Sequence, residues 1–130
     1  NNTSASAWNL LALGYRYSGN VSASLKVYED LLKLNPGHFL LSTNFGNLCM
    51  AIGKVNKAIE CFESAREKEP SHAPNLEALA IAYQDSGKTS KAMETFKNVL
   101  KIPIKLNKRK KKDLIQILIF WAIFMQTKLI

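Results

Sequence analysis

Two cysteines and two histidines are the first side chains in this sequence that suggest chemistry, because thiols and imidazoles bind metals and act as nucleophiles or bases. Cys49 and Cys61 are not in a C-x-x-C arrangement, and His38 and His72 lack the support of further His, Cys or carboxylate ligands. We therefore expect the cysteines to be small apolar packing residues. We expect the histidines to serve the loops in which they stand, and we expect no metal site and no cofactor.

Acidic side chains are concentrated between residues 60 and 69, where paired carboxylates could act as general acid and base. Basic residues are interleaved with them, as the full set shows: Glu60, Glu63, Glu67, Glu69, Lys57, Arg66 and Lys68. Opposite charges spaced four residues apart are typical of a solvated helix face. The sequence also contains no Gly-rich phosphate loop, no His-Glu-x-x-His and no Gly-x-Ser-x-Gly. The prediction is a chain that is not an enzyme.

The elements that carry these residues repeat along the chain with a step of 34 residues. The shared pattern is a glycine, a small residue, an aromatic residue and a proline: Gly19, Ser24, Tyr28 and Pro36; Gly53, Ala58, Phe62 and Pro70; Gly87, Ala92, Phe96 and, slightly early, Pro103. The segments "LNPGHF", "KEPSHA" and "KIPIKL" each place a helix-breaking proline where one unit passes to the next.

Each unit is predicted to form two antiparallel helices joined by a tight turn. Apolar residues recur at three and four residues before each glycine: Trp8, Leu11, Ala12 and Tyr15; Phe45, Gly46 and Cys49; Leu76, Leu79, Ala80 and Tyr83. The glycine can take the left-handed conformation that ends a helix. Second helices are expected over about 22–34, 56–68 and 90–101. Neither helix can cover its apolar face alone, so the units must stack.

This pattern resembles the tetratricopeptide repeat (TPR) family, whose repeat reads Trp-x2-Leu-Gly-x2-Tyr, Ala-x3-Phe, Pro. The resemblance covers residues 5–104 and implies an all-α fold, an α-solenoid of three helix-turn-helix repeats at 5–38, 39–72 and 73–106, the last with an irregular end. Small residues let the two helices of each unit approach closely: Ala12, Ser24, Gly46, Ala58, Ala80 and Ala92.

The resemblance also implies a binding surface, since the first helices of TPR units line a concave groove that holds an extended or helical peptide. Carried over position by position, the groove residues are Asn9, Leu13, Arg16, Tyr17, Asn44, Asn47, Met50, Glu77, Ile81, Gln84 and Asp85. Asparagine amides can hydrogen-bond a peptide backbone in either direction, and Tyr17 and Met50 offer adaptable apolar contact.

One TPR subtype clamps the terminal carboxylate of a chaperone tail with lysine, arginine and asparagine side chains. The corresponding positions here are Asn9, Leu13, Asn44, Pro74 and Ala78. Only Asn44 fits, and the cations that would pair with a carboxylate are missing. We expect this chain not to bind chaperone tails through that clamp.

Most of the net charge of +8 belongs to the C-terminal tail. Residues 1–103 hold eleven basic and nine acidic side chains, whereas 104–130 hold seven and one. The distribution disfavours nucleic acid as the partner of the repeats. Residues 105–130 run from "KRKKK" into an almost wholly apolar segment. Three interpretations remain: a capping helix that also docks something else, a membrane anchor through 108–130, or sequence that was not selected as protein.

The sequence thus predicts a non-catalytic scaffold or adaptor that binds a peptide or helix of a partner protein. A rival hypothesis makes the repeats the substrate-recruiting arm of a larger enzyme, for example a glycosyltransferase. The opening "NNTSASAW" has no secretory signal and no initiator methionine, so we expect a cytoplasmic protein and a fragment or processed chain.

Overall fold

The structure is a computed structural model that describes residues 2–102 and 108–128, and these residues contain helices and no strands. The helices belong to two compact units, residues 1–70 and 71–130. The predicted all-α fold is confirmed, including a helix in the tail. The end of the third predicted repeat, with Pro103, and residues 129–130 of the tail lie outside the described residues.

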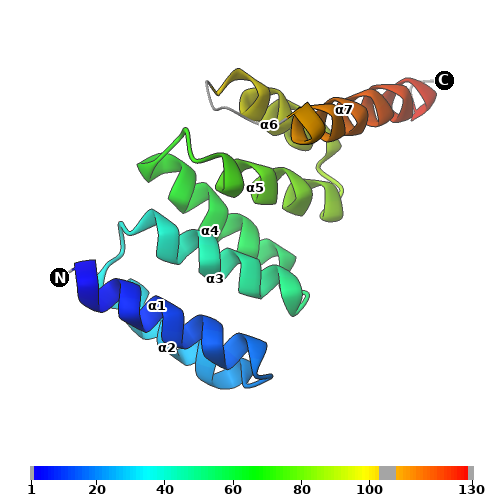
Figure 1. The fold of residues 1–130 in the computed structure, drawn as a ribbon. Helices are drawn as coiled ribbons and strands as arrows, with labels where there is room; N and C mark the ends of the chain where they lie inside the picture. The colour runs from blue at the N-terminus through cyan, green and yellow to red at the C-terminus, as the bar shows by residue number, and fades with distance from the viewer. Residues whose placement is uncertain (1, 103–107, 129–130) are drawn as a thin grey trace. The chain divides into compact units, whose positions relative to one another are not determined.

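The first unit contains two helical hairpins (Figure 1). Helix α1 (Asn2–Tyr17) pairs with α2 (Val21–Leu34), and α3 (Phe39–Ala51) pairs with α4 (Val55–Lys68). Small residues allow the close approach within each pair. The Ser24 hydroxyl donates to the Ala12 carbonyl at 2.8 Å, and a Cβ added at Gly46 would overlap the ring of Phe62. Both hairpins therefore depend on the small positions that the repeat pattern indicated.

Glycines with positive φ end the first helix of each hairpin. The φ angles of Gly19, Gly53 and Gly87 are 90°, 82° and 82°. After α3, the Lys54 N–H donates to the Cys49 carbonyl at 2.8 Å and the Gly53 N–H donates to the Met50 carbonyl at 3.1 Å. These two bonds satisfy the last carbonyls of the helix in a Schellman motif, which needs the left-handed conformation that glycine adopts without strain.

Aromatic stacking joins the two hairpins of the first unit. The rings of Tyr28 on α2 and Phe45 on α3 are stacked, with centroids 5.8 Å apart and an interplanar angle of 16°. Both side chains are buried. On α1, however, Trp8 and Leu11 are 49% and 40% exposed, although the apolar pattern marked them for burial. The reason is that hairpin α1–α2 has a neighbouring hairpin on only one side within this unit.

The second unit contains the third hairpin and the tail helix. Helix α5 (Ala73–Asp85) pairs with α6 (Thr89–Lys101), and α7 (Lys108–Lys128) lies against α6 (Figure 1). The hairpin core is formed by Leu79, Ala80, Tyr83, Ala92, Phe96 and Val99. Lys91 Nζ lies 5.7 Å from the centre of the Tyr83 ring, in a cation–π contact at the edge of this core.

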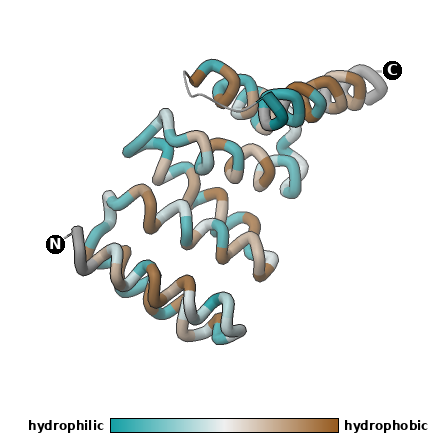
Figure 2. Tube along the Cα trace, in the orientation of Figure 1, coloured by the Kyte–Doolittle hydropathy of each residue, from teal (hydrophilic) through white to brown (hydrophobic). Residues whose placement is uncertain are grey.

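The distribution of polar and apolar residues in α7 differs from that in the hairpins. Hydrophilic and hydrophobic residues alternate along α1 to α6, whereas α7 is hydrophilic at its N-terminal end and mostly hydrophobic beyond it (Figure 2). Large apolar side chains of α7 remain exposed: Ile115, Ile117, Ile119, Phe120, Ile123 and Phe124. Beyond its basic N-terminal turns, the exposed surface of this helix is therefore mostly apolar, as the sequence predicted.

Candidate functional site

Seven of the predicted groove residues lie on α1 and α3 of the first unit, and none of them is fully buried. Asn9, Leu13 and Arg16 follow one another at four and three residues and so share one face of α1. All three are half-buried, as are Asn44, Asn47 and Met50 of α3, while Tyr17 is 78% exposed. These side chains are therefore accessible to a ligand while their helices are fixed by the hairpin cores.

A hydrogen bond joins the two helices at the centre of this set. Asn44 Nδ2 donates to Asn9 Oδ1 at 3.0 Å, and the hydroxyl of buried Tyr28 donates to the same oxygen at 3.3 Å. The Asn9 oxygen thus accepts two bonds, which fixes the orientation of its amide. The Asn9 amino group and the Asn44 carbonyl oxygen take no part in these two bonds, so this half-buried pair has a further donor and a further acceptor to offer a ligand.

Arg16 provides positive charge near this amide pair. Its guanidinium lies 5.5 Å from the centre of the Tyr17 ring, in a cation–π contact. Burial raises the pKa of Tyr28 to about 12, and the positive charge of Arg16 acts in the opposite direction. The Tyr28 hydroxyl therefore stays protonated at neutral pH and remains a donor to Asn9.

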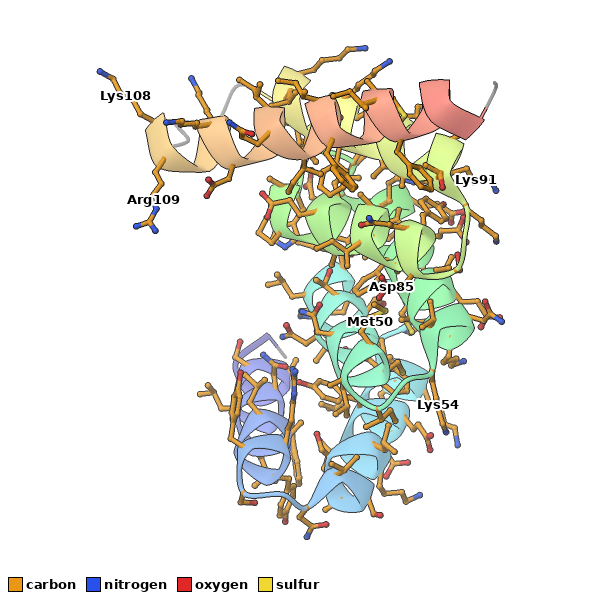
Figure 3. All side chains as sticks on the ribbon, turned by 90° about the vertical axis from the view of Figure 1, so that its right-hand side faces the viewer. Met50, Lys54, Asp85, Lys91, Lys108 and Arg109 are labelled. Atoms are coloured by element: carbon orange, nitrogen blue, oxygen red, sulfur yellow. The ribbon has the colours of Figure 1, made fainter. Side chains whose placement is uncertain are left out.

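The last residues of α3 continue the surface. Met50 lies in the final turn of α3, and Lys54 follows after the glycine turn (Figure 3). The flexible thioether of Met50 can fit ligand side chains of different shapes. The apolar contacts expected from the sequence were Tyr17 and Met50, and the structure leaves Tyr17 exposed on α1 and Met50 half-buried on α3.

Four predicted groove residues belong to α5 in the second unit. Glu77 is half-buried, Ile81 is 45% exposed, and Gln84 and Asp85 are exposed near the C-terminal end of α5, where Figure 3 labels Asp85. Ile81, Gln84 and Asp85 are spaced so that they share one side of the helix. Their role in binding stays a prediction of the repeat spacing.

The two histidines are N-cap residues, as loop chemistry predicted. His38 Nδ1 accepts a hydrogen bond from the Leu41 N–H at 3.3 Å, which caps α3. His72 occupies the corresponding position before α5. Within the described part of the chain, no group of three or more His, Cys, Asp or Glu side chains is placed to hold a metal ion.

The two cysteines are buried and unoxidised, as packing residues would be. The thiols of Cys49 on α3 and Cys61 on α4 share a hydrogen bond. This bond lowers the pKa of Cys49, and together with burial it raises the pKa of Cys61. Cys61 is therefore a protonated thiol at neutral pH and a poor nucleophile.

The charged residues of α4 form a solvated face, but with a different spacing from the one expected. Lys57 pairs with Glu60 at 3.6 Å, and Arg66 pairs with Glu63 at 3.8 Å, each across three residues rather than four. Exposed pairs of this kind contribute at most about 1 kcal/mol each. Nothing in their geometry resembles a pair of catalytic carboxylates.

The first unit also has a surface cavity that sequence reasoning missed. This cavity of about 480 Å³ lies between α2, α3 and α4. Its lining includes Leu32, Phe45 and Cys61, with Lys33 and Glu60 among its charged residues. The cavity arises from the packing of the two hairpins, which the repeat spacing alone does not predict.

None of the described helices is long and apolar enough to cross a membrane.

The comparisons with protein families agree with this geometry. A family model described as tetratricopeptide repeat matches residues 5–38, and a second model with the same description matches residues 76–110. The first match has the same bounds as the first predicted repeat. The chain belongs to the tetratricopeptide repeat family.

Two curated proteins resemble this chain. Protein FlbA of Caulobacter vibrioides is 29% identical over 94 residues, which is 72% of this chain and 16% of that protein. A TPR repeat-containing protein of Methanocaldococcus jannaschii is 36% identical over 57 residues, which is 44% of this chain and 17% of that protein. The chain spans about a sixth of the length of these curated relatives.

Solved structures share the fold. The type III secretion translocator chaperone SycD of Yersinia enterocolitica has a TM-score of 0.87 at 14% identity, covering 97% of this chain and 88% of that one. SycD has also been solved in complex with a peptide of the translocator YopD. The first TPR of Spaghetti (RPAP3), bound to the HSP90 peptide SRMEEVD, has a TM-score of 0.79 at 17% identity, covering 94% of this chain and 96% of that one.

Proposed function

We propose that this chain is a non-catalytic protein-interaction module whose α1–α3 face binds an extended peptide or a helix of a partner protein. The observation that carries the proposal is the hydrogen bond between Asn44 and Asn9, which joins the two first helices into one accessible polar surface. The free amide groups of this pair offer a donor and an acceptor that match the alternating groups of a peptide backbone.

The surroundings of the amide pair support the same ligand class. Leu13 on α1 and Met50 on α3 are half-buried apolar side chains. They can contact apolar side chains of a ligand that lies on the α1–α3 face. Arg16 adds one cation, which favours a ligand with an acidic residue near its contact. SycD and RPAP3, which share the fold, bind peptides according to the complexes in which they were solved, and this is consistent with the proposal.

The rival hypothesis, a recruiting arm of a larger enzyme, uses the same peptide-binding surface and differs only in what the remainder of the protein does. The four α5 residues, Glu77, Ile81, Gln84 and Asp85, are proposed as a further set of contacts that can be tested separately. Cytoplasmic location also stays a prediction.

The proposal can be tested with a peptide that binds the full chain. Such a peptide is first selected from a displayed library of random peptides, with the full chain as the bait. Its dissociation constant should be measured by fluorescence anisotropy with the wild type, with Asn47→Ala and with Asn56→Ala. Asn47 is half-buried on the proposed face, whereas Asn56 is exposed on α4. Loss of one or two hydrogen bonds should weaken binding about 3- to 30-fold in Asn47→Ala.

Asn56→Ala is the matched control, because it makes the same chemical change on a helix outside the proposed face, and its affinity should equal that of the wild type. The proposal is wrong if Asn47→Ala and Asn56→Ala bind the selected peptide equally well while the cavity variant Leu32→Ala loses it. That result would place peptide binding in the cavity between α2, α3 and α4.

A further inference from the structure

The outer side of α7 combines positive charge and exposed apolar surface in one continuous stripe. Lys108, Lys112, Ile115, Ile119 and Ile123 follow one another at four and three residues, so they share one side of the helix. Ile119 and Ile123 are 52% and 58% exposed. The cations therefore occupy the first turns of the stripe and the isoleucines occupy the remainder.

A neighbouring stripe repeats this order. Arg109 and Phe120 stand eleven residues apart, which brings them back to nearly the same side of a helix. Phe120 is 62% exposed. Lys108 and Arg109 both extend away from the N-terminal end of α7 (Figure 3). Because α7 lies against α6, its opposite side is the one that a ligand outside the unit would meet.

Acidic residues are scarce on α7, whose first turns are mostly basic. Among the described side chains, the ion pairs are Lys26–Asp30, Lys57–Glu60 and Arg66–Glu63, and none involves Lys108, Arg109 or Lys112. The only acidic residue of α7 is Asp113. The cluster at residues 108–112 therefore attracts an anionic surface.

We propose that the outer side of α7 binds an anionic lipid surface, with the Lys and Arg side chains at the headgroup phosphates and the Ile and Phe side chains at the acyl boundary. Long basic side chains can reach the headgroups while neighbouring apolar residues are immersed, and this arrangement is typical of helices that lie at a membrane interface. The helix stays attached to α6, so it brings the peptide-binding repeats to the membrane surface.

Two other kinds of ligand would each account for only one of the two features of α7, either its cations or its exposed apolar side chains. A second copy of the chain would cover the isoleucines and phenylalanines, but its acidic residues are interleaved with lysine and arginine and offer no acidic cluster for residues 108–112. A nucleic acid would neutralise the cations, but it would leave the row of isoleucines exposed. An anionic lipid surface accounts for both features.

Sedimentation of the full chain with vesicles tests the proposal. The vesicles should be pure phosphatidylcholine or phosphatidylcholine with about one third phosphatidylserine. We expect the partition coefficient to be at least about tenfold higher with phosphatidylserine and to fall as salt screens the charges. The triple variant Lys108→Gln/Arg109→Gln/Lys112→Gln should lose that difference. Lys33→Gln/Lys68→Gln/Lys97→Gln, with the same loss of charge from exposed positions elsewhere, should keep it.

The apolar part needs its own variant. Ile119→Ser/Ile123→Ser should reduce partitioning into both kinds of vesicle by about tenfold or more, because each side chain loses its burial in lipid. Leu34→Ser/Leu40→Ser removes exposed apolar residues outside α7 and should leave partitioning unchanged. All altered side chains are exposed, and thermal unfolding of each variant checks that its fold is retained.

Three results would overturn the proposal. The first is equal partitioning of the Lys108→Gln/Arg109→Gln/Lys112→Gln variant and the wild type. The second is a concentration-dependent dimer in light scattering that Ile119→Ser/Ile123→Ser abolishes, which would assign the stripe to a second copy. The third is tighter binding of a single-stranded RNA oligonucleotide than of anionic vesicles. Peptide affinity does not enter any of these measurements, so they stand independently of the proposed function.

Discussion

Asn44 on α3 donates a hydrogen bond to Asn9 on α1 at 3.0 Å, across two successive repeats of the chain. The same Asn9 oxygen accepts from the Tyr28 hydroxyl of α2 at 3.3 Å. One amide oxygen thus links three helices of the first unit. The bond fixes the geometry of the proposed peptide-binding face and also contributes to the packing of the two hairpins.

A double-mutant cycle should show that Asn9 and Asn44 are coupled. Asn44→Ala removes one hydrogen bond and should lower the free energy of unfolding by about 0.5–1.5 kcal/mol. Asn9→Ala should be more destabilising, because it also leaves the buried Tyr28 hydroxyl without its acceptor. Urea unfolding of the wild type, both single variants and the double variant gives the coupling. Strictly additive effects would contradict the bond.

Gly46→Ala should destabilise the second hairpin, because the added methyl group overlaps the Phe62 ring. Overpacking of this kind costs about 1–3 kcal/mol. That strain exceeds the roughly 0.5–1 kcal/mol by which alanine is better than glycine within a helix. Gly14→Ala is the matched control, since a Cβ at Gly14 on α1 meets nothing within 4 Å. This control should stabilise the chain in the same urea titration, and a stabilised Gly46→Ala would contradict the close approach.

The fold was predictable from sequence because its determinants are local. Glycine is favoured at position 53 because the helix ends there in a left-handed residue, and a small residue is favoured at position 58 because two helices approach closely there. Both constraints recur in each repeat, so their positions predict the hairpins. The second helices, expected over 22–34, 56–68 and 90–101, begin within one residue of those bounds and end at the same residues.

The details of the candidate site were less accessible, because they depend on contacts between hairpins. Nothing in the sequence spacing predicts that Asn44 reaches Asn9, since that bond needs the distance between α1 and α3. The exposure of Trp8 likewise depends on whether another hairpin covers α1. Repeat positions predict which residues face the same side of a helix, and packing decides which of them bind each other.

High pH should reveal the burial of Tyr28. Its pKa is about 12 in the folded chain against an ordinary value of 10.0, so the folded state holds the proton more tightly than the unfolded state. The resulting stabilisation is fully present below pH 10 and is lost as the pH rises from 10 toward 12. Within that interval, the contribution of Tyr28 to the free energy of unfolding falls by up to about 1.4 kcal/mol per pH unit.

Tyr28→Phe isolates this effect, because phenylalanine has no proton to release. At neutral pH the variant should be less stable than the wild type, since it lacks the hydrogen bond to Asn9. The difference in unfolding free energy between the two should shrink as the pH rises from 10 to 12. Urea titrations at several pH values measure it. A difference that stays constant with pH would mean that Tyr28 titrates normally.

The HSP90 peptide SRMEEVD, which the first TPR of RPAP3 binds, should not bind this chain. A carboxylate clamp needs cationic and amide side chains, whereas this chain has Leu13 on α1 and Pro74 and Ala78 on α5 at the corresponding positions. Without those cations, the terminal carboxylate would lose its charge-assisted hydrogen bonds, each worth about 1.5–3 kcal/mol. Fluorescence anisotropy with labelled SRMEEVD should therefore show binding to the RPAP3 domain and none to this chain at the same concentrations. Comparable affinity for both proteins would show that other cations replace the clamp, and Arg16→Gln would then identify whether the cation of the α1 surface is responsible.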